Sequence, residues 1–257
     1  SCGGKHSLYN ACQVLFQTGD EVIIFSPYWV SFPDFVAVTG AKPVFVKTDS
    51  HHQFEPDYDD LKSKITNRTS GIIINSPSNP TGGVWTDDAV IKVLEIAREI
   101  NAWVFSDECY EQLTYDRPYV STATLIEDYD RVLTFQSCSK TYAMTGWRIG
   151  YAAGNKDIIK AMGKLQGQST SCPNSIAQTA AIEALTGDQS KVDIMRTKFK
   201  KRRNFIVDCL NNMKDVSCDT PGGAFYVFPN FSAYIKKSEK INCSDDLSMY
   251  LLEKKSV

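Results

Sequence analysis

The sequence predicts an α/β protein, with a three-layer α-β-α arrangement around a mostly parallel sheet and then part of a small α+β C-terminal domain. Two patterns predict it. Short, continuously apolar runs rich in β-branched residues alternate with amphipathic helical segments, which is typical of strands covered by helices on both faces. Near residue 200 this alternation stops. We therefore expect a large domain over residues 1–200 and a partial small domain over residues 201–257.

Six apolar runs are expected to form the strands of the sheet. The first, EVIIFS, is short, apolar and β-branched, which favours a buried strand. The six runs occupy residues 21–26, 40–48, 70–77, 102–108, 131–137 and 150–154.

Helical patterns lie between these runs. A glycine turn at the start of the chain leads into a predicted helix that Gly19 is expected to end. Its apolar face consists of Leu8, Ala11, Cys12 and Leu15. Residues 86–100 predict a helix capped by Thr86, with acids in its first turn and apolar spacings of three and four. Residues 172–187 predict another, with proline near its start and glycine at its end.

The last third of the chain has a different pattern. Residues 188–213 predict a long helix, and the basic run at 200–203 is expected on its solvated face. Its apolar stripe consists of Val192, Met195, Phe199 and Ile206. Residues 217–231 predict a turn followed by a strand, and residues 245–255 predict a helix.

Composition narrows the class of protein. The chain has 257 residues and a net charge of −2, so there is no broad basic surface and no nucleic-acid partner is expected. The eight cysteines form no CxxC pair and the three histidines lack metal-ligand spacing with them, so we expect no metal site. Free thiols indicate the reducing cytoplasm. No apolar run approaches a membrane span, and no membrane partner is expected. The first residue is not methionine and the last residues read as mid-helix, so further sequence is expected at both ends.

Chemically versatile side chains follow the predicted strands. In an open α/β sheet, ligands bind beyond the carboxyl ends of the strands, so residues just after each strand are candidates for a site. Four strands are followed by Trp29, by Asn79, by Asp107 with Tyr110, and by Lys140. Each has an ordinary structural explanation on its own: a core ring, a turn, a helix cap, a packed ring and a surface amine.

Together these side chains match the needs of a pyridoxal phosphate site. Its aldehyde forms an imine with a lysine, and a buried carboxylate keeps its pyridine nitrogen protonated. Hydroxyl and amide donors bind the ring oxygen, and an aromatic side chain stacks on the ring. Helix amides, hydroxyls and an arginine bind the phosphate. The sequence has a candidate for each group, including the turn before the first helix and Arg148.

Several motifs carry a family resemblance through essentially the whole chain. They are SPYWVSFPDF, NSPSNPTGG, SDECYEQLTYD, SCSKTYAMTGWRIGY and GAFYVFPNF. In these motifs the sequence resembles class I pyridoxal-phosphate aminotransferases of fold type I, and most of all the bacterial-type aspartate aminotransferases.

The resemblance implies a role for each matching residue. Lys140 would hold the cofactor as an imine and then move the proton between the substrate and the cofactor. Asp107 would pair with the pyridine nitrogen, and Tyr110 and Asn79 would bind the ring oxygen. Trp29 would stack on the ring, and both Trp29 and Asn79 would contact substrate. The phosphate would be bound by Gly4, Lys5, Ser137, Ser139 and Arg148.

Three parts of the family pattern are missing from this sequence. Two of them are the N-terminal segment that closes over substrate, expected before Ser1, and the arginine that binds the substrate α-carboxylate, expected after Val257. The third, the residue that selects a distal carboxylate, is not located in the sequence. The cofactor chemistry can therefore be predicted from the sequence, and the choice of substrate cannot.

The function implied is transfer of an amino group between an L-amino acid, with aspartate favoured, and 2-oxoglutarate, in a homodimer. Two alternatives stay open. One is another enzyme with the same cofactor and fold, either an aromatic or alanine aminotransferase or a lyase resembling aminocyclopropane-carboxylate synthase. The other is a non-catalytic aminotransferase-like domain of a regulator. The partners expected are an amino acid and a 2-oxo acid.

Overall fold

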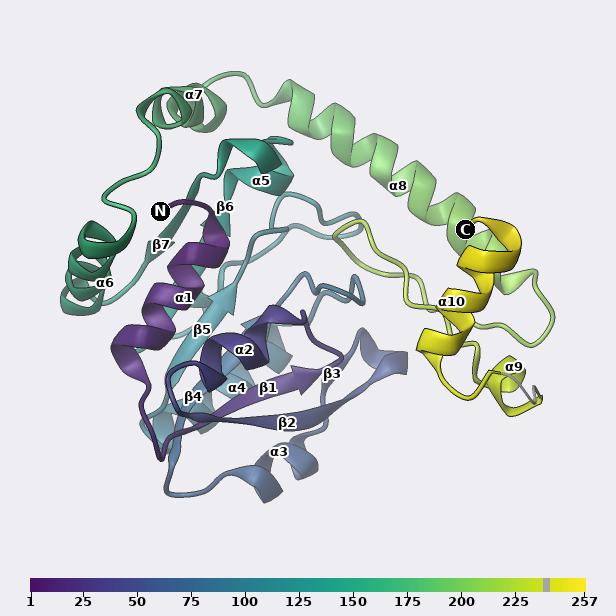
Figure 1. Cartoon of the computed structure of the whole chain (residues 1–257), viewed down its shortest axis with the longest axis horizontal. Coiled ribbons are helices and arrows are strands. Elements are labelled where there is room, and N and C mark those ends of the chain that lie inside the picture. The colour runs from purple at the N-terminus through teal and green to yellow at the C-terminus, as the bar shows by residue number, and fades with distance from the viewer. Residues whose placement is uncertain (238–240) are drawn as a thin grey trace.

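A computed structural model describes residues 1–237 and 241–257, and its centre is a seven-stranded sheet (Figure 1). The strand order is β3-β2-β1-β4-β5-β6-β7. The strands are β1 Glu21–Ser26, β2 Lys42–Asp49, β3 Glu55–Pro56, β4 Thr69–Asn75, β5 Trp103–Asp107, β6 Val132–Ser137 and β7 Gly150–Ala153. The pairs formed among β2, β1, β4, β5 and β6 are parallel, while β3 and β7 pair antiparallel at the two edges. All six predicted strands are present, and the three-layer α/β prediction is confirmed.

Helices cover both faces of the sheet. The helices are α1 Gly4–Leu15, α2 Ser31–Ala37, α3 Tyr58–Lys64, α4 Asp87–Glu99, α5 Cys138–Thr141, α6 Lys156–Ser169, α7 Ser175–Thr186, α8 Ser190–Asn211, α9 Ser232–Lys237 and α10 Ser244–Lys255. On one face, α1, α2 and α6 bury Leu8, Phe32 and Met162 against the sheet. On the other, α3 and α4 bury Leu61 and Val93. Because both faces are buried, the central strands are apolar at nearly every position.

The predicted start of one helix and the predicted end of another can be compared with the structure. Thr86 caps α4 as predicted, since its side chain accepts a hydrogen bond from the Ala89 amide. The prediction that Gly19 ends α1 is wrong: the helix ends at Leu15, and Phe16 is already extended. Phe16 is buried and stacks on Phe105 with ring centroids 5.2 Å apart, so the chain leaves the helix early to place this ring in the core.

The predicted apolar stripe of α8 is partly wrong. Val192 is buried, but Ile206 is 41% exposed, and the stripe instead continues through Arg203, Val207 and Leu210. Arg203 was expected on a solvated face. It is 8% exposed because it lies four residues after Phe199 and four before Val207, on the side of α8 that faces the protein.

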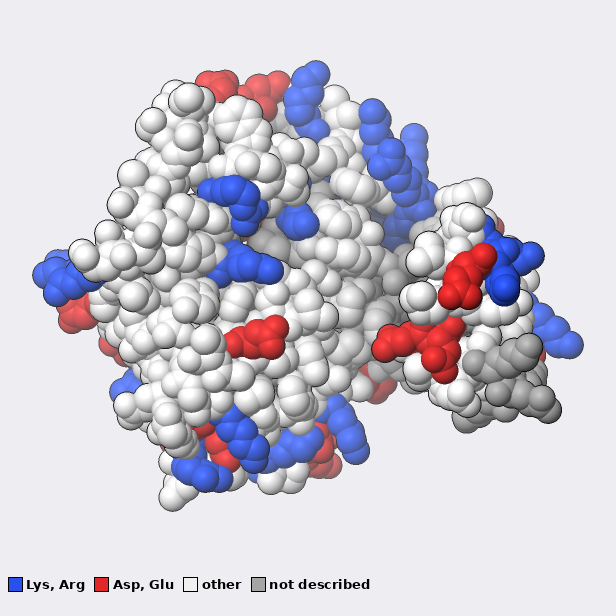
Figure 2. All heavy atoms as spheres, in the orientation of Figure 1, with Lys and Arg blue, Asp and Glu red and all other residues white. Residues whose placement is uncertain are grey.

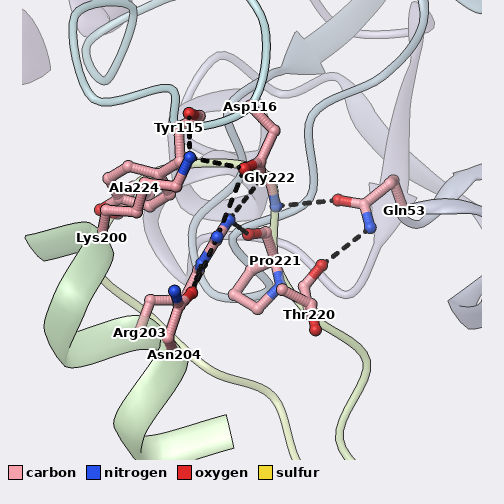
Figure 3. A network of polar contacts seen from close by, with 10 residues as sticks. All are labelled: Gln53, Tyr115, Asp116, Lys200, Arg203, Asn204, Thr220, Pro221, Gly222 and Ala224. Carbon is pink, nitrogen blue, oxygen red and sulfur yellow. Dashed lines mark hydrogen bonds and ion pairs between the residues drawn. The ribbon is translucent and has the colours of Figure 1, made fainter.

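Buried Arg203 joins α8 to two distant loops (Figure 3). Its guanidinium donates hydrogen bonds to Asp116, at 2.5 Å, and to the carbonyl of Pro221, at 2.9 Å. It also donates to Asn204 on its own helix. Lys200 adds an ion pair to Asp116 at 3.0 Å, and these contacts, with Arg203's bond first, lower the pKa of Asp116. The basic run therefore holds the loop after β5 and the segment around residue 221 together.

Replacing Arg203 by alanine is expected to destabilise the protein by about 2–4 kcal/mol, because the buried Pro221 carbonyl loses its donor, Asp116 loses an ion pair, and the buried stem of Arg203 leaves a void. Arg196→Ala on the same helix is the matched control. The Arg196 pair with Asp193 is exposed, so its loss should cost no more than about 1 kcal/mol. Urea unfolding of both variants measures the difference, and equal losses would contradict the structural role given to Arg203.

The predicted strand within residues 217–231 is wrong. In the described residues, this segment forms only isolated bridges, between Thr114 and Gly223 and between Ser217 and Asn230. Ala224 has a left-handed φ of 54°, which interrupts an extended run. The helix predicted at 245–255 is present as α10. Because α8 runs without a break through residue 200, the domain boundary placed there stays a prediction.

Charge is mixed on the surface. On the face shown in Figure 2, acidic and basic side chains are interspersed at the margins, and basic side chains gather around a hollow near the centre. Within the described residues, no helix is both long enough and apolar enough to cross a membrane.

Candidate active site

A cavity of about 280 Å³ lies where the carboxyl ends of β5 and β6 meet the start of α1. Its position agrees with the rule that open α/β sheets bind ligands beyond the carboxyl ends of their strands. All ten predicted site residues line it: Gly4, Lys5, Trp29, Asn79, Asp107, Tyr110, Ser137, Ser139, Lys140 and Arg148. The structure thus brings together side chains that are up to 144 positions apart in the chain (Gly4 to Arg148).

Asp107 is the last residue of β5 and supplies a carboxyl group to the cavity wall. Parallel pairing places it between Asn75 on β4 and Phe135 on β6. It is 5% exposed, and burial raises the pKa of its carboxyl group to about 6. The Cys109 amide donates a hydrogen bond to Asp107 Oδ1 at 3.2 Å, which partly offsets this effect. A carboxylate desolvated in this way would be stabilised by a cation brought into the cavity.

Asn79 is placed by the strand next to Asp107. The Asn79 amide donates to Asn75 Oδ1 at 2.7 Å, and Asn75 Nδ2 donates to the backbone carbonyl of Asp107 at 3.1 Å. Asn75 therefore fixes the loop that carries Asn79 relative to the end of β5. Sequence reasoning did not assign this role to Asn75.

Lys140 lies on α5, a single helical turn that starts directly after β6. Ser137 caps this turn by accepting a hydrogen bond from the Ser139 amide at 3.2 Å. The Lys140 amine lies 5.8 Å from the ring centroid of Tyr110 and 5.2 Å from that of Phe225. The amine therefore has aromatic neighbours while remaining on the wall of the cavity.

Hydroxyls, an arginine and the start of a helix also line the cavity. Ser137 Oγ and Ser139 Oγ are 2.9 Å apart, and Arg148 is held by a hydrogen bond to the carbonyl of Thr145 at 2.8 Å. Gly3, before α1, has a φ of 95°, and a Cβ there would lie 2.3 Å from Arg148 Nη2. Only glycine leaves space for the guanidinium beside the helix start, and this combination suits an anionic group.

Trp29 supplies an aromatic surface. It packs edge-on against Phe32 and Phe35, with centroids 5.4 Å and 5.8 Å away. The Lys5 amine lies over its ring at 4.8 Å. These contacts fix the ring plane of Trp29 at the cavity wall.

The cavity has further lining residues that sequence reasoning missed. They are Leu8, Cys109, Phe135, Gln136 and Thr145. Cys109 lies within the DECY motif and Gln136 precedes Ser137, so their position at strand ends was the available signal. Tyr226 was missed as well, although its hydroxyl lies 2.6 Å from that of Tyr110. No local pattern could assign it, because it comes from a segment 116 residues away.

The cavity therefore combines a buried acid, an anion site and a primary amine with aromatic neighbours. Three of its lining side chains, Lys5, Lys140 and Arg148, are basic. Such a site can bind an anionic, aromatic molecule with a basic ring nitrogen.

Comparison with known proteins identifies a family with this fold. The family model "Aminotransferase class I and II" matches residues 1–257. The aspartate/prephenate aminotransferase of Cereibacter sphaeroides is 45% identical over 262 residues, covering 99% of this chain and 66% of the relative. The aspartate aminotransferase of Geobacillus stearothermophilus is 47% identical over 230 residues, covering 89% and 58%. The chain thus spans 58% to 66% of the length of these curated relatives.

Solved structures match the fold. The Rhizobium meliloti aspartate aminotransferase has a TM-score of 0.93 and 38% identity, covering 99% of this chain and 65% of that one. The Thermus thermophilus aspartate aminotransferase with maleate has a TM-score of 0.87 and 38% identity, covering 91% and 61%. On the match of the whole chain and the close identity to these relatives, the chain belongs to the class I and II aminotransferase family.

Proposed function

We propose that the full-length protein is a pyridoxal-phosphate-dependent aminotransferase that moves an amino group between L-aspartate and 2-oxoglutarate. The observation that carries this proposal is the cavity in which Asp107, Lys140 and Arg148 meet. Its acid, amine and cation are the three groups that the chemistry requires, and they come from three separate segments of the chain.

The residues present fit pyridoxal phosphate. The missing Cβ of Gly3 leaves room for Arg148, and a second close approach is made by Gly150, where a Cβ would lie 2.2 Å from the Gly4 amide nitrogen. These glycines let β7 and the start of α1 form a compact cradle suited to a phosphate. In the same cavity, the buried carboxyl of Asp107 suits a protonated ring nitrogen.

When bound, pyridoxal phosphate supplies an electron sink for the electrons released as bonds at the substrate Cα break. Asp107 would hold a proton on the ring nitrogen, and Tyr110 and Asn79 would donate hydrogen bonds to the ring oxygen. Burial raises the pKa of the Tyr110 hydroxyl, so this group stays a neutral donor at working pH.

Lys140 would be both the attachment point and the proton carrier. Its Nζ, once free, takes the proton that leaves the substrate Cα. Gly4, Lys5, Ser137, Ser139 and Arg148 would bind the phosphate. Trp29 would stack on the ring and, with Asn79, contact the substrate. Groups that bind the ring and the phosphate at several points would orient the cofactor relative to the Lys140 amine.

Aspartate is proposed as the amino donor because relatives at 45% and 47% identity carry aspartate in their names. The name of the first also gives prephenate, so this oxo acid is a second candidate acceptor. An alanine aminotransferase of Pyrococcus furiosus has a TM-score of 0.88 at 32% identity, which keeps other donors in the test.

The test is an assay of the full-length protein against a panel of amino acids and oxo acids. Aspartate with 2-oxoglutarate should give the highest kcat/KM, with alanine and the aromatic amino acids lower, and prephenate is assayed as acceptor beside 2-oxoglutarate. Highest activity with another donor would overturn the substrate assignment alone. No amino transfer with any pair would overturn the proposed function.

A homodimer is proposed for the full-length protein. On helix α7, Ile182 is 63% exposed and Leu185 is 44% exposed, and their spacing of three places them on one face. Neighbouring exposed aliphatic side chains on one helix face are typical of an interface. Light scattering after size exclusion should give twice the monomer mass.

A further inference from the structure

Tyr226 contacts Tyr110, a wall residue of the proposed active site, from outside the active-site cavity. Its hydroxyl lies 2.6 Å from the hydroxyl of Tyr110, and Tyr110 is 2% exposed. Tyr110 lines the active-site cavity, whereas Tyr226 lines a separate cavity beside α8. The hydroxyl pair is therefore a contact between the wall of the site and a residue that does not itself reach the site.

The number of hydroxyl protons in the pair indicates which tyrosine donates the hydrogen bond. A tyrosine hydroxyl has one proton to donate and lone pairs that accept. If Tyr110 donates its proton into the cavity, it cannot also donate to Tyr226. The hydrogen bond between the two hydroxyls then persists only when Tyr226 is the donor.

We propose that Tyr226 is a positioning residue that aims the proton of Tyr110 at the ring oxygen of the cofactor, an inference that rests on the proposed function. Tyr226 donates to Tyr110, and Tyr110 donates into the cavity. Hydrogen bonds in such a chain polarise and strengthen one another in a desolvated setting. The pair thereby determines how strongly Tyr110 binds the ring oxygen.

The segment that carries Tyr226 is fixed to the two loops that supply ring-oxygen donors. The Ala224 amide donates to the carbonyl of Leu113 at 2.8 Å, beyond Tyr110 in the same loop. The Gly223 amide donates to the carbonyl of Gly82 at 2.9 Å, in the loop of Asn79. A Cβ on Gly82 would lie 2.8 Å from the carbonyl oxygen of Tyr226, so only glycine permits this approach.

Three further side chains, from Gln53, Tyr115 and Arg203, hold the segment (Figure 3). Gln53 bonds both the Thr220 carbonyl, at 3.0 Å, and the Gly222 amide, at 2.9 Å. The Tyr115 hydroxyl donates to the Ala224 carbonyl. Arg203 binds the Pro221 carbonyl. With its backbone fixed by these contacts, Tyr226 has a defined ring position, edge-on to Tyr110 with centroids 5.7 Å apart at 76°.

The hydroxyl pair also stays protonated. Burial raises the pKa of both Tyr110 and Tyr226 above the ordinary tyrosine value. Both groups therefore keep a proton at physiological pH, as a donor chain requires.

The test is a double-mutant cycle of Tyr226→Phe and Tyr110→Phe in the full-length protein. One readout is the dissociation constant of pyridoxal phosphate from the cofactor-free protein. The other is the pH titration of the visible absorption band of the bound cofactor. Tyr226→Phe should weaken binding about threefold to tenfold, the size of one hydrogen bond, and shift the titration upward by several tenths of a pH unit. In the Tyr110→Phe background it should change neither.

Tyr115→Phe is the matched control. It removes a hydroxyl that anchors the same segment at Ala224 but does not touch Tyr110. It should leave the titration in place. If Tyr115→Phe reproduces the shift, anchoring of the segment explains it and the inference is overturned. Two other results overturn the inference alone, provided that the unmodified protein binds the cofactor. In one, Tyr226→Phe changes neither the dissociation constant nor the titration. In the other, Tyr226→Phe has the same effect in the Tyr110→Phe background as in the parent. If the unmodified protein does not bind pyridoxal phosphate, both the proposed function and the inference that rests on it are wrong.

Discussion

Lys140→Ala in the full-length protein is expected to lower turnover by at least about 10³-fold, or about 4 kcal/mol of activation free energy. The reason is that Lys140 is the primary amine of α5 at the cavity wall, next to Tyr110 and Phe225. It has two proposed tasks, attachment of the cofactor and transfer of the Cα proton, and alanine removes both. The visible absorption band of the lysine-bound cofactor should disappear as well. Absorption spectra and steady-state kinetics on one preparation measure the two losses.

Lys5→Ala is the control for charge. Lys5 lines the same cavity and its amine lies over Trp29, so its removal also takes one positive charge from the site. It should lower the affinity for the cofactor but keep the absorption band. Multiple turnovers by the Lys140→Ala protein would refute the catalytic role, and loss of the band in both variants would assign the effect to charge.

The sheet and the cavity could be predicted from sequence because both follow local rules. The apolar, β-branched runs become strands at the expected positions, since burial on both faces permits no polar alternation. The carboxyl ends of β5 and β6 then meet at one edge, so Asp107, which ends β5, and Lys140, which follows β6, line one cavity although they are 33 positions apart. Their chemical roles remain predictions.

Long-range partners could not be predicted in the same way. The sequence places Arg203 in a basic run that is expected to be solvated. Its burial depends on Asp116, which lies 87 positions earlier. Residues around Phe225 read as a strand, but Ala224 turns left-handed and its amide bonds the carbonyl of Leu113 in a loop. Tyr226 gains its place from these non-local contacts. The general reason is that periodicity reports which face is buried, not which distant segment covers it.

Asp107→Asn is expected to have opposite effects on activity and on the stability of the cofactor-free protein. Activity should fall about 10²–10³-fold, because a neutral amide cannot hold a proton on the ring nitrogen through charge pairing. Stability should rise at neutral pH. Burial raises the pKa of Asp107 from 3.8 to about 6, so the folded, empty protein ionises this group at a cost that the unfolded chain does not bear.

The sign of the pH dependence follows from that shift. The contribution of Asp107 to stability is fully present below about pH 4 and is lost as the pH rises through about 6, because the unfolded chain releases the proton more readily. A shift of about two units corresponds to about 3 kcal/mol. Asparagine does not ionise and keeps an oxygen that can accept the hydrogen bond from Cys109. Its advantage over the parent should therefore be about 1.5 kcal/mol at pH 5 and about 3 kcal/mol at pH 8.

Urea unfolding of the cofactor-free, full-length proteins at the two pH values measures this advantage. Asp128→Asn serves as the control: it makes the same chemical change at an exposed position with a φ of 55°, which asparagine tolerates, and should not alter the pH dependence. Added pyridoxal phosphate should then reverse the order, since the parent gains a charge pair on binding and Asp107→Asn does not. A variant that is less stable than the parent at pH 8 without cofactor would show that the Asp107 carboxylate is already compensated in the empty site. In that case, groups of the protein itself stabilise the Asp107 carboxylate, and no bound cation is needed to do so.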